Sequence, residues 1–200
     1  MDTTHLQFPP VFLFADSEFT NLADRTPLSF GIAAQDGRRF YVELDDTDLN
    51  HCSDFVITHV LPLMGEDPAA RCDCRDAGLR LRQWLIAYAD RDVVLVHTYI
   101  ADREIFFDLL RAEPGAGRTI VGTLQEHEAF ADLGLELGLA KLLPMDVGTR
   151  VNQDAFAHYF EVNSQARRHH SLDDALALMA AFLTHPGARA AAQIGEPHGQ

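Results

Sequence analysis

The stretch VFLFADSEFTNL, residues 11–22, is the most informative for the fold, because its pattern indicates a buried strand that carries two acids. Residues 11–16 are apolar up to Asp16, a pattern that predicts a strand inside a sheet. Glu18 follows two residues later, and residues two apart in an extended chain point to the same face. A buried strand has no structural need for two acids on one face, so Asp16 and Glu18 are candidate functional residues.

The rest of the chain alternates short apolar runs with helical patterns. Asp36-Gly37 lies between two apolar runs, which is a strong signal for a β-hairpin. We expect an α/β fold with a mixed five-stranded sheet and helices on both faces. The further strands are predicted at 28–35, 38–44, 92–99 and 118–124, and the helices at 54–64, 75–89, 102–112, 125–138, 152–162 and 171–184.

Two more acids lie where a predicted strand ends or a predicted helix begins. Asp102 follows the strand at 92–99, and Asp174 lies in the first turn of the last helix. Either acid alone is better explained by helix capping, because the helix dipole favours acids there. Together with Asp16 and Glu18 they indicate a shared crevice at the C-terminal ends of neighbouring strands. Converging carboxylates repel one another unless cations bind, and oxygen ligands suit Mg²⁺ or Mn²⁺. Two such ions about 3.5–4 Å apart form the kind of site that cleaves phosphodiesters.

His169 is the candidate general base of this site. It precedes Asp174 by five residues, which in a continuous helix would separate the two by roughly 140°. A shared site therefore requires His169 to lie in the loop before the helix, with Ser171 as the N-cap. On spacing alone, a solvated loop histidine is the better explanation, since the chain has ten histidines.

The order of these motifs resembles the DEDDh branch of the DnaQ-like 3′–5′ exonucleases, which have a ribonuclease H-like fold. DSEFTNL (16–22) is similar to the extended first motif of oligoribonuclease-like members, D-x-E-x-T-x-L. HTYIAD (97–102) is similar to the second motif, H-N-x-x-F-D, and HHSLDDA (169–175) to the third, H-x-A-L-x-D-A. THVLP (58–62) also looks like small bacterial exoribonucleases of this superfamily. The resemblance covers about residues 11–184.

This resemblance implies a two-metal 3′–5′ exonuclease that releases nucleoside 5′-monophosphates from the 3′ ends of single-stranded RNA or short oligonucleotides. It implies that Asp16 bridges two Mg²⁺ or Mn²⁺ ions, with Glu18 and Asp174 on the water-activating side and Asp102 near the second ion. His169 would be the general base. The backbone and hydroxyl around Phe19 and Thr20 would touch the terminal nucleotide, and Leu22 would wedge beside the last base. By analogy with relatives, we also expect a homodimer.

Several positions depart from the family pattern. Asn21 stands where Gly is usual, and Asn tolerates a left-handed backbone. Thr98 and Ala101 replace the usual Asn and Phe of the second motif, and Ser171 replaces Ala in the third. The family spacing selects His169 over His170, and Asp174 over Asp173. For His97, a buried, hydrogen-bonded side chain is the expected role.

The bulk composition describes one ordinary globular domain, expected at 1–185 with a flexible tail at 186–200. The net charge of −14 disfavours an enzyme that grips long duplex DNA, because such grip comes from basic residues. Short or single-stranded substrates held through metal ions fit this charge better. The longest apolar run is too short to cross a membrane, and residues 1–14 show no signal peptide. Cys52, Cys72 and Cys74 are expected as reduced thiols in the cytoplasm, those of Cys72-Asp73-Cys74 at the surface rather than on zinc.

Two alternatives to an exoribonuclease stay open on the sequence. One is an exonuclease specific for the 3′ ends of single-stranded DNA, since only the 2′-OH distinguishes the two substrates at such a site. The other is a non-catalytic nucleic-acid-binding or protein-binding module on the same fold, although a module has no need for all five motif residues.

Overall fold

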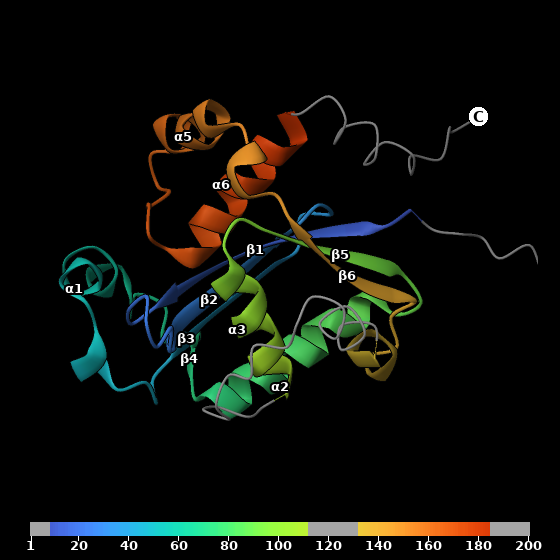
Figure 1. The fold of residues 1–200 in the computed structure, drawn as a ribbon, viewed down its shortest axis with the longest axis horizontal. Coiled ribbons are helices and arrows are strands. Elements are labelled where there is room, and N and C mark those ends of the chain that lie inside the picture. The colour runs from blue at the N-terminus through green and yellow to red at the C-terminus, as the bar shows by residue number, and fades with distance from the viewer. Residues whose placement is uncertain (1–8, 112–131, 185–200) are drawn as a thin grey trace, which may run out of the picture.

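A computed structural model of the chain describes residues 9–111 and 132–184 (Figure 1). These residues form an α/β fold around a six-stranded mixed sheet with the strand order β4-β3-β2-β1-β5-β6. The strands are β1 (Val11–Phe19), β2 (Pro27–Ala34), β3 (Arg39–Leu44), β4 (Arg71–Cys72), β5 (Asp92–His97) and β6 (Lys141–Asp146).

The direction of the strands changes within the sheet. β2 pairs antiparallel with β1 and with β3, and the hairpin signal at Asp36-Gly37 predicts the pairing of β2 with β3. β5 pairs parallel with β1, β6 pairs parallel with β5, and β4 pairs parallel with β3. Parallel neighbours need long connections, and the helices that precede β6 in the chain lie in those connections.

The prediction of five strands is wrong for the described part of the chain, because β4 and β6 were not expected. β4 is only two residues long and carries no pattern of its own. β6 has the sequence KLLPMD, and Pro144 argues against a strand in the middle of a sheet. β6 lies at the end of the strand order, where a missing N–H is tolerated. The strand predicted at 118–124 lies outside the described residues.

The helices follow the predicted periodicity closely. The predicted helix at 54–64 ends earlier, at His59, and a 3-10 turn follows at Leu61–Leu63. Of the helix predicted at 125–138, residues 132–136 are described and helical. The longer helices are α1 (Asp54–His59), α2 (Cys74–Leu85), α3 (Ile100–Arg111), α5 (Gln153–Val162) and α6 (Ser171–Thr184).

The two faces of the sheet have separate cores. Val11, Leu13 and Ala15 of β1 belong to the core that contains the buried residues of α2 and α3. Phe12 and Phe14 belong to the opposite core, with residues of α5 and α6. Figure 1 shows α5 and α6 on one side of the sheet and α2 and α3 on the other. Helices therefore cover both faces, as expected.

Within residues 9–111 and 132–184, none of the helices has the length and apolar character that crossing a membrane requires.

Candidate metal centre

The strand β1 carries Asp16 and Glu18 onto the face covered by α6. β1 does not end at Asp16 as predicted; it continues to Phe19, and Glu18 pairs with Ser29 of β2. The alternation that sends Phe12 and Phe14 into the α6 core therefore continues through Asp16 and Glu18. The prediction that both acids share one face agrees with this register.

A glycine in β2 allows α6 to approach these acids. Gly31 pairs with Asp16, and a Cβ built on Gly31 would lie 2.4 Å from the backbone N of Leu172 and 2.5 Å from the carbonyl C of Ser171. Only glycine permits such an approach, so the first turn of α6 lies directly on the sheet beside Asp16. Gly31 was not among the predicted site residues, although a glycine inside a strand signals a close backbone approach.

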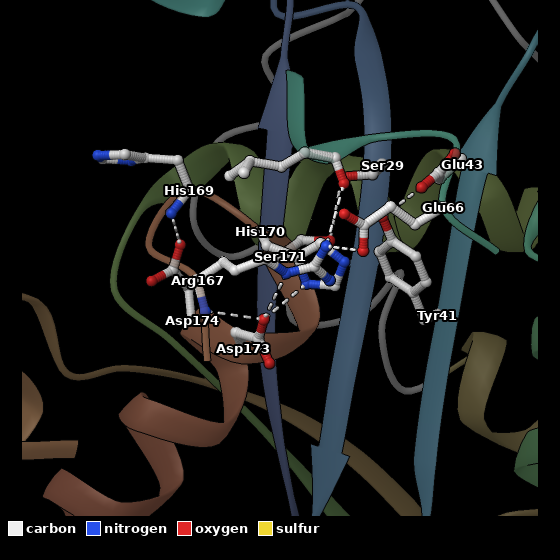
Figure 2. Close-up of polar contacts among 11 residues, drawn as sticks. Ser29, Tyr41, Glu43, Glu66, Arg167, His169, His170, Ser171, Asp173 and Asp174 are labelled. Carbon is white, nitrogen blue, oxygen red and sulfur yellow. Dashed lines mark hydrogen bonds and ion pairs between the residues drawn. The ribbon is translucent and has the colours of Figure 1, made fainter. Parts of the chain in front are cut away.

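The loop before α6 presents His169 beside Asp174. α6 begins at Ser171, so His169 lies in the preceding loop, as required for a shared site. Its backbone is left-handed, with φ 65°, and its N–H donates to Oδ2 of Asp174 at 2.8 Å (Figure 2). The prediction of Ser171 as N-cap is wrong: Ser171 is the first helical residue, and its hydroxyl lies 3.1 Å from that of Ser29.

Three of the predicted residues come together closely enough to share one cation. One ligand atom each of Glu18, His169 and Asp174 lie within 4.8 Å of one another. Asp174 is buried, while Glu18 and His169 are half-buried. The donor set contains two carboxylates and one imidazole.

Asp102 lies on the α3 side of β1 and is held by three donors. The N–H and the hydroxyl of Ser17 donate to its Oδ1 at 3.1 Å and 2.7 Å, and the N–H of Tyr99 donates to its Oδ2 at 3.1 Å. The bond from Tyr99 is one half of a capping box, so the capping role considered for Asp102 is present in the structure. The bonds from Ser17 are additional, and they tie the start of α3 to β1.

Burial raises the pKa values of all four carboxyl groups above the ordinary range, and neighbouring acids add to the effect at Asp16 and Glu18. Burial, followed by the charges of Asp102, Asp174 and Glu18, raises the pKa of Asp16 well above its usual value. Burial and the charges of Asp174 and Asp102 raise the pKa of Glu18 to about 8. Burial is also the main cause that raises the pKa values of Asp102 and Asp174 to about 7, against the effect of their hydrogen bonds. A divalent cation would relieve this repulsion, and the four carboxylates offer oxygen ligands that suit Mg²⁺ or Mn²⁺.

The two adjacent histidines have different surroundings. His170 is buried, its ring lies 4.5 Å from that of Tyr41, and its Nδ1 lies 3.3 Å from Oδ2 of Asp173. Asp173 also accepts the backbone N–H of Arg167 (Figure 2). Burial, His59 and Arg168 lower the pKa of His169, which leaves its imidazole neutral and able to accept a proton near neutral pH.

The residues predicted to touch the substrate differ in accessibility. Leu22 is 72% exposed, and Phe19 is half-buried with its ring stacked 6.0 Å from that of Tyr99. Thr20 is fully buried, and its N–H and C=O bond to Thr26 and Ser53, so in this conformation it has no surface for a ligand.

The turn after Thr20 is not held as expected. Asn21 does not adopt a left-handed backbone; its Oδ1 accepts the N–H groups of Ala23 and Asp24 at 2.8 Å and 2.9 Å. The left-handed residue of this turn is Arg25, with φ 49°. The side chain of Asn21 therefore organises the turn that exposes Leu22.

Exposed rings of α1 lie beside His169, and neither was among the predicted site residues. Phe55 is 51% exposed, and its ring meets that of His169 edge-on at 5.0 Å. The ring of His59 lies 6.1 Å from that of His169. Helical spacing alone gave no reason to assign Phe55 to a site rather than to the core.

His97, Cys72 and Cys74, which were also considered for function, are buried. His97 is buried and its Nδ1 lies 3.1 Å from the carbonyl of Tyr99, which agrees with its expected role. Its Nε2 meets no hydrogen-bond partner among the described residues. Cys72 and Cys74 are free thiols but buried, so the expectation that they lie at the surface is wrong.

Of the arginines near the third motif, one is already paired. Arg167 contacts Glu66 at 2.5 Å and Asp173 at 3.4 Å. Arg168 is exposed, with its guanidinium 5.1 Å from the ring of Phe160, and its charge lowers the pKa of His169. Arg168 is therefore the better placed of the two for contact with a ligand.

Comparison with known proteins adds no assignment: no protein-family model matches the chain, and no curated protein matches it either.

Proposed function

We propose that this chain is a metal-dependent 3′–5′ exonuclease with a ribonuclease H-like fold and acts on short single-stranded RNA. The observation that carries the proposal is the approach of ligand atoms of Glu18, His169 and Asp174 to within 4.8 Å. The charges of Asp102 and Asp174 raise the pKa values of both Asp16 and Glu18, which supports a shared cation site. The order of the motifs, which resembles the DEDDh exonucleases, supports the choice of reaction.

The four acids would hold two Mg²⁺ or Mn²⁺ ions. Bound there, such ions activate the attacking water and stabilise the leaving oxygen of a phosphodiester. His169 would take the proton of the attacking water, because its imidazole is neutral and lies beside Asp174 and Glu18. Ser17 would fix the orientation of Asp102 through its two hydrogen bonds.

The preference for a short, single-stranded substrate rests on the surface around the acids. Leu22 and Phe55 are exposed apolar side chains, and Phe55 lies against His169. Aromatic and apolar side chains stack with unpaired bases of any sequence. The net charge of −14 gives no general attraction for a long phosphate backbone. The free thiols are consistent with a cytoplasmic enzyme, and a homodimer remains a proposal by analogy.

Product analysis on a short RNA tests the proposal. The full chain is incubated with Mn²⁺ and an RNA labelled at either its 3′ or its 5′ end. We expect the 3′ label to appear as a nucleoside 5′-monophosphate at the earliest times, while the 5′ label moves through a ladder of shorter products. Internal cleavage, or no cleavage, would reject the proposal. A matched DNA oligomer shows whether the substrate is DNA instead, and titration calorimetry with Mn²⁺ identifies a binding module without a metal site.

A further inference from the structure

The candidate centre contains a nitrogen donor as well as oxygen donors. The imidazole of His169 and the carboxylates of Glu18 and Asp174 each place one ligand atom within 4.8 Å of the other two. Mg²⁺ takes oxygen ligands and retains water, so it has no use for the imidazole. Zn²⁺ binds imidazole and carboxylate together, usually with three protein ligands when a fourth position stays open.

We propose that Glu18, His169 and Asp174 form a three-ligand site for Zn²⁺, and that Zn²⁺ bound there inhibits the enzyme by occupying its base. The binding site follows from the geometry alone. The inhibition rests on the proposed nuclease function, because it requires His169 to be needed for the reaction.

The surroundings of the three side chains support a preformed site. Donors of a tetrahedral Zn²⁺ lie roughly 3.3 Å apart, since each bond is about 2.0–2.1 Å long, and small side-chain rotations bring donors within 4.8 Å to that spacing. The N–H of His169 donates to Oδ2 of Asp174 and so holds this carboxylate beside the imidazole. The same bond fixes the loop on which the imidazole is carried.

Neighbouring histidines provide matched controls. His170 is adjacent in sequence but is buried against Tyr41, with its Nδ1 directed at Asp173. His59 is exposed on α1, and its ring lies 6.1 Å from that of His169. Neither residue shares the close set of ligand atoms found for Glu18, His169 and Asp174.

The test measures metal binding rather than activity. Zn²⁺ and Mg²⁺ are titrated separately into the full chain, and Co²⁺ is used as a coloured substitute for Zn²⁺ to report the coordination. The key variant is His169→Asn, because asparagine accepts the left-handed backbone that His169 adopts. The variants His170→Asn and His59→Asn serve as controls, and thermal melts show which variants are folded.

We expect His169→Asn to weaken Zn²⁺ binding at least about tenfold, the order of loss typical when a metal site is damaged. Its Mg²⁺ affinity should stay within about twofold of wild type, and the intense visible absorption of low-coordinate Co²⁺ should be lost. The two control variants should bind both ions with wild-type affinity. Glu18→Gln, which removes a different ligand, should weaken both ions.

Unchanged Zn²⁺ affinity in His169→Asn, or an equal loss for Zn²⁺ and Mg²⁺, would overturn the site. If Zn²⁺ binds through His169 but the wild type never cleaves RNA, the metal site stands and the nuclease proposal fails. If RNA is cleaved and the Zn²⁺ affinity does not depend on His169, the nuclease proposal stands and this inference fails.

Discussion

Ser17 donates both its backbone N–H and its hydroxyl to the same oxygen of Asp102, at 3.1 Å and 2.7 Å. The parallel pairing of β1 with β5 ends at Phe14 and Val96, so Ser17 lies beyond it. Its N–H therefore bonds to a side chain instead of a neighbouring strand. This contact joins the start of α3 to the strand that carries Asp16 and Glu18.

Ser17→Ala should reduce activity about 10- to 100-fold, because residues that orient metal ligands typically have effects of this size. The loss should be partly recovered at high Mn²⁺, since the variant weakens the hold on Asp102 without removing the carboxylate. Mn²⁺-dependent kinetics measure both effects. Thr184→Ala removes a hydroxyl at the far end of α6 and should have no effect. A Ser17→Ala enzyme with wild-type metal dependence would contradict this role.

The raised pKa values predict how stability depends on pH. The folded state retains protons on Asp16, Glu18, Asp102 and Asp174 at pH values where the unfolded chain, with ordinary values of 3.8 and 4.5, has lost them. Stability without divalent cations should therefore fall as pH rises from about 4 to about 8. Mn²⁺ should raise the melting temperature more at the upper end of this range. Thermal melts across pH, with and without Mn²⁺, measure this. A stability that rises over the same range would contradict it.

Asp16→Asn removes one of these charges. In the absence of divalent ions it should raise the melting temperature by a few degrees, since about 1 kcal/mol corresponds to roughly 2–4 °C for a chain of this size. It should also abolish most of the stabilisation by Mn²⁺. Glu136→Gln removes an exposed acid and should change neither property. If Mn²⁺ stabilises Asp16→Asn as much as wild type, Asp16 is not a ligand of the metal centre.

His169→Asn should mainly reduce activity, whereas His170→Asn should mainly reduce stability. Loss of a general base typically costs about 10²- to 10⁴-fold in rate, so His169→Asn should lose most of its activity while remaining folded. His170→Asn should lower the melting temperature, because His170 packs on Tyr41, but it should keep activity within about tenfold of wild type. Single-turnover rates and melts separate these effects. Equal rates in the two variants would reject His169 as the base.

Gly31→Ala should damage the fold and the site together. Its Cβ would overlap the backbone of Leu172 and Ser171, so α6 must move away from Asp16. Overpacking of this kind costs about 1–3 kcal/mol, and Mn²⁺ binding should weaken as well. In Gly37→Ala the new Cβ meets nothing, but φ is +88°, so this control should lose stability and keep the binding of Mn²⁺. Melts and calorimetry on both variants test the distinction.

The elements that could be predicted from the sequence are those with strong local signals. The strand at Val11, the hairpin at Asp36-Gly37 and the helix at Ser171 follow from periodicity and turn chemistry. β6 was missed because its signal comes from pairing with β5, which overrides the weak propensity of KLLPMD. β4 is too short to show any period.

The same distinction applies to the site. Asp16, Glu18, Asp102, Asp174 and His169 could be predicted as candidates because acids and a histidine in this order have a chemical meaning. Ser17, Gly31 and Phe55 were missed because their roles depend on contacts between distant segments. The sequence around Ser17 does not indicate that Asp102 is its hydrogen-bond partner. The sequence around Gly31 does not indicate that the backbone of Leu172 lies against it.

Consecutive residues of β1 serve opposite sides of the sheet: Asp16 and Glu18 face α6, and Ser17 binds Asp102 at the start of α3. Deleting or inserting one residue between Phe14 and Asp16 would exchange the two sides, with the serine turned toward α6 and the acids toward α3. This strand should therefore accept changes of side-chain identity far more readily than changes of length.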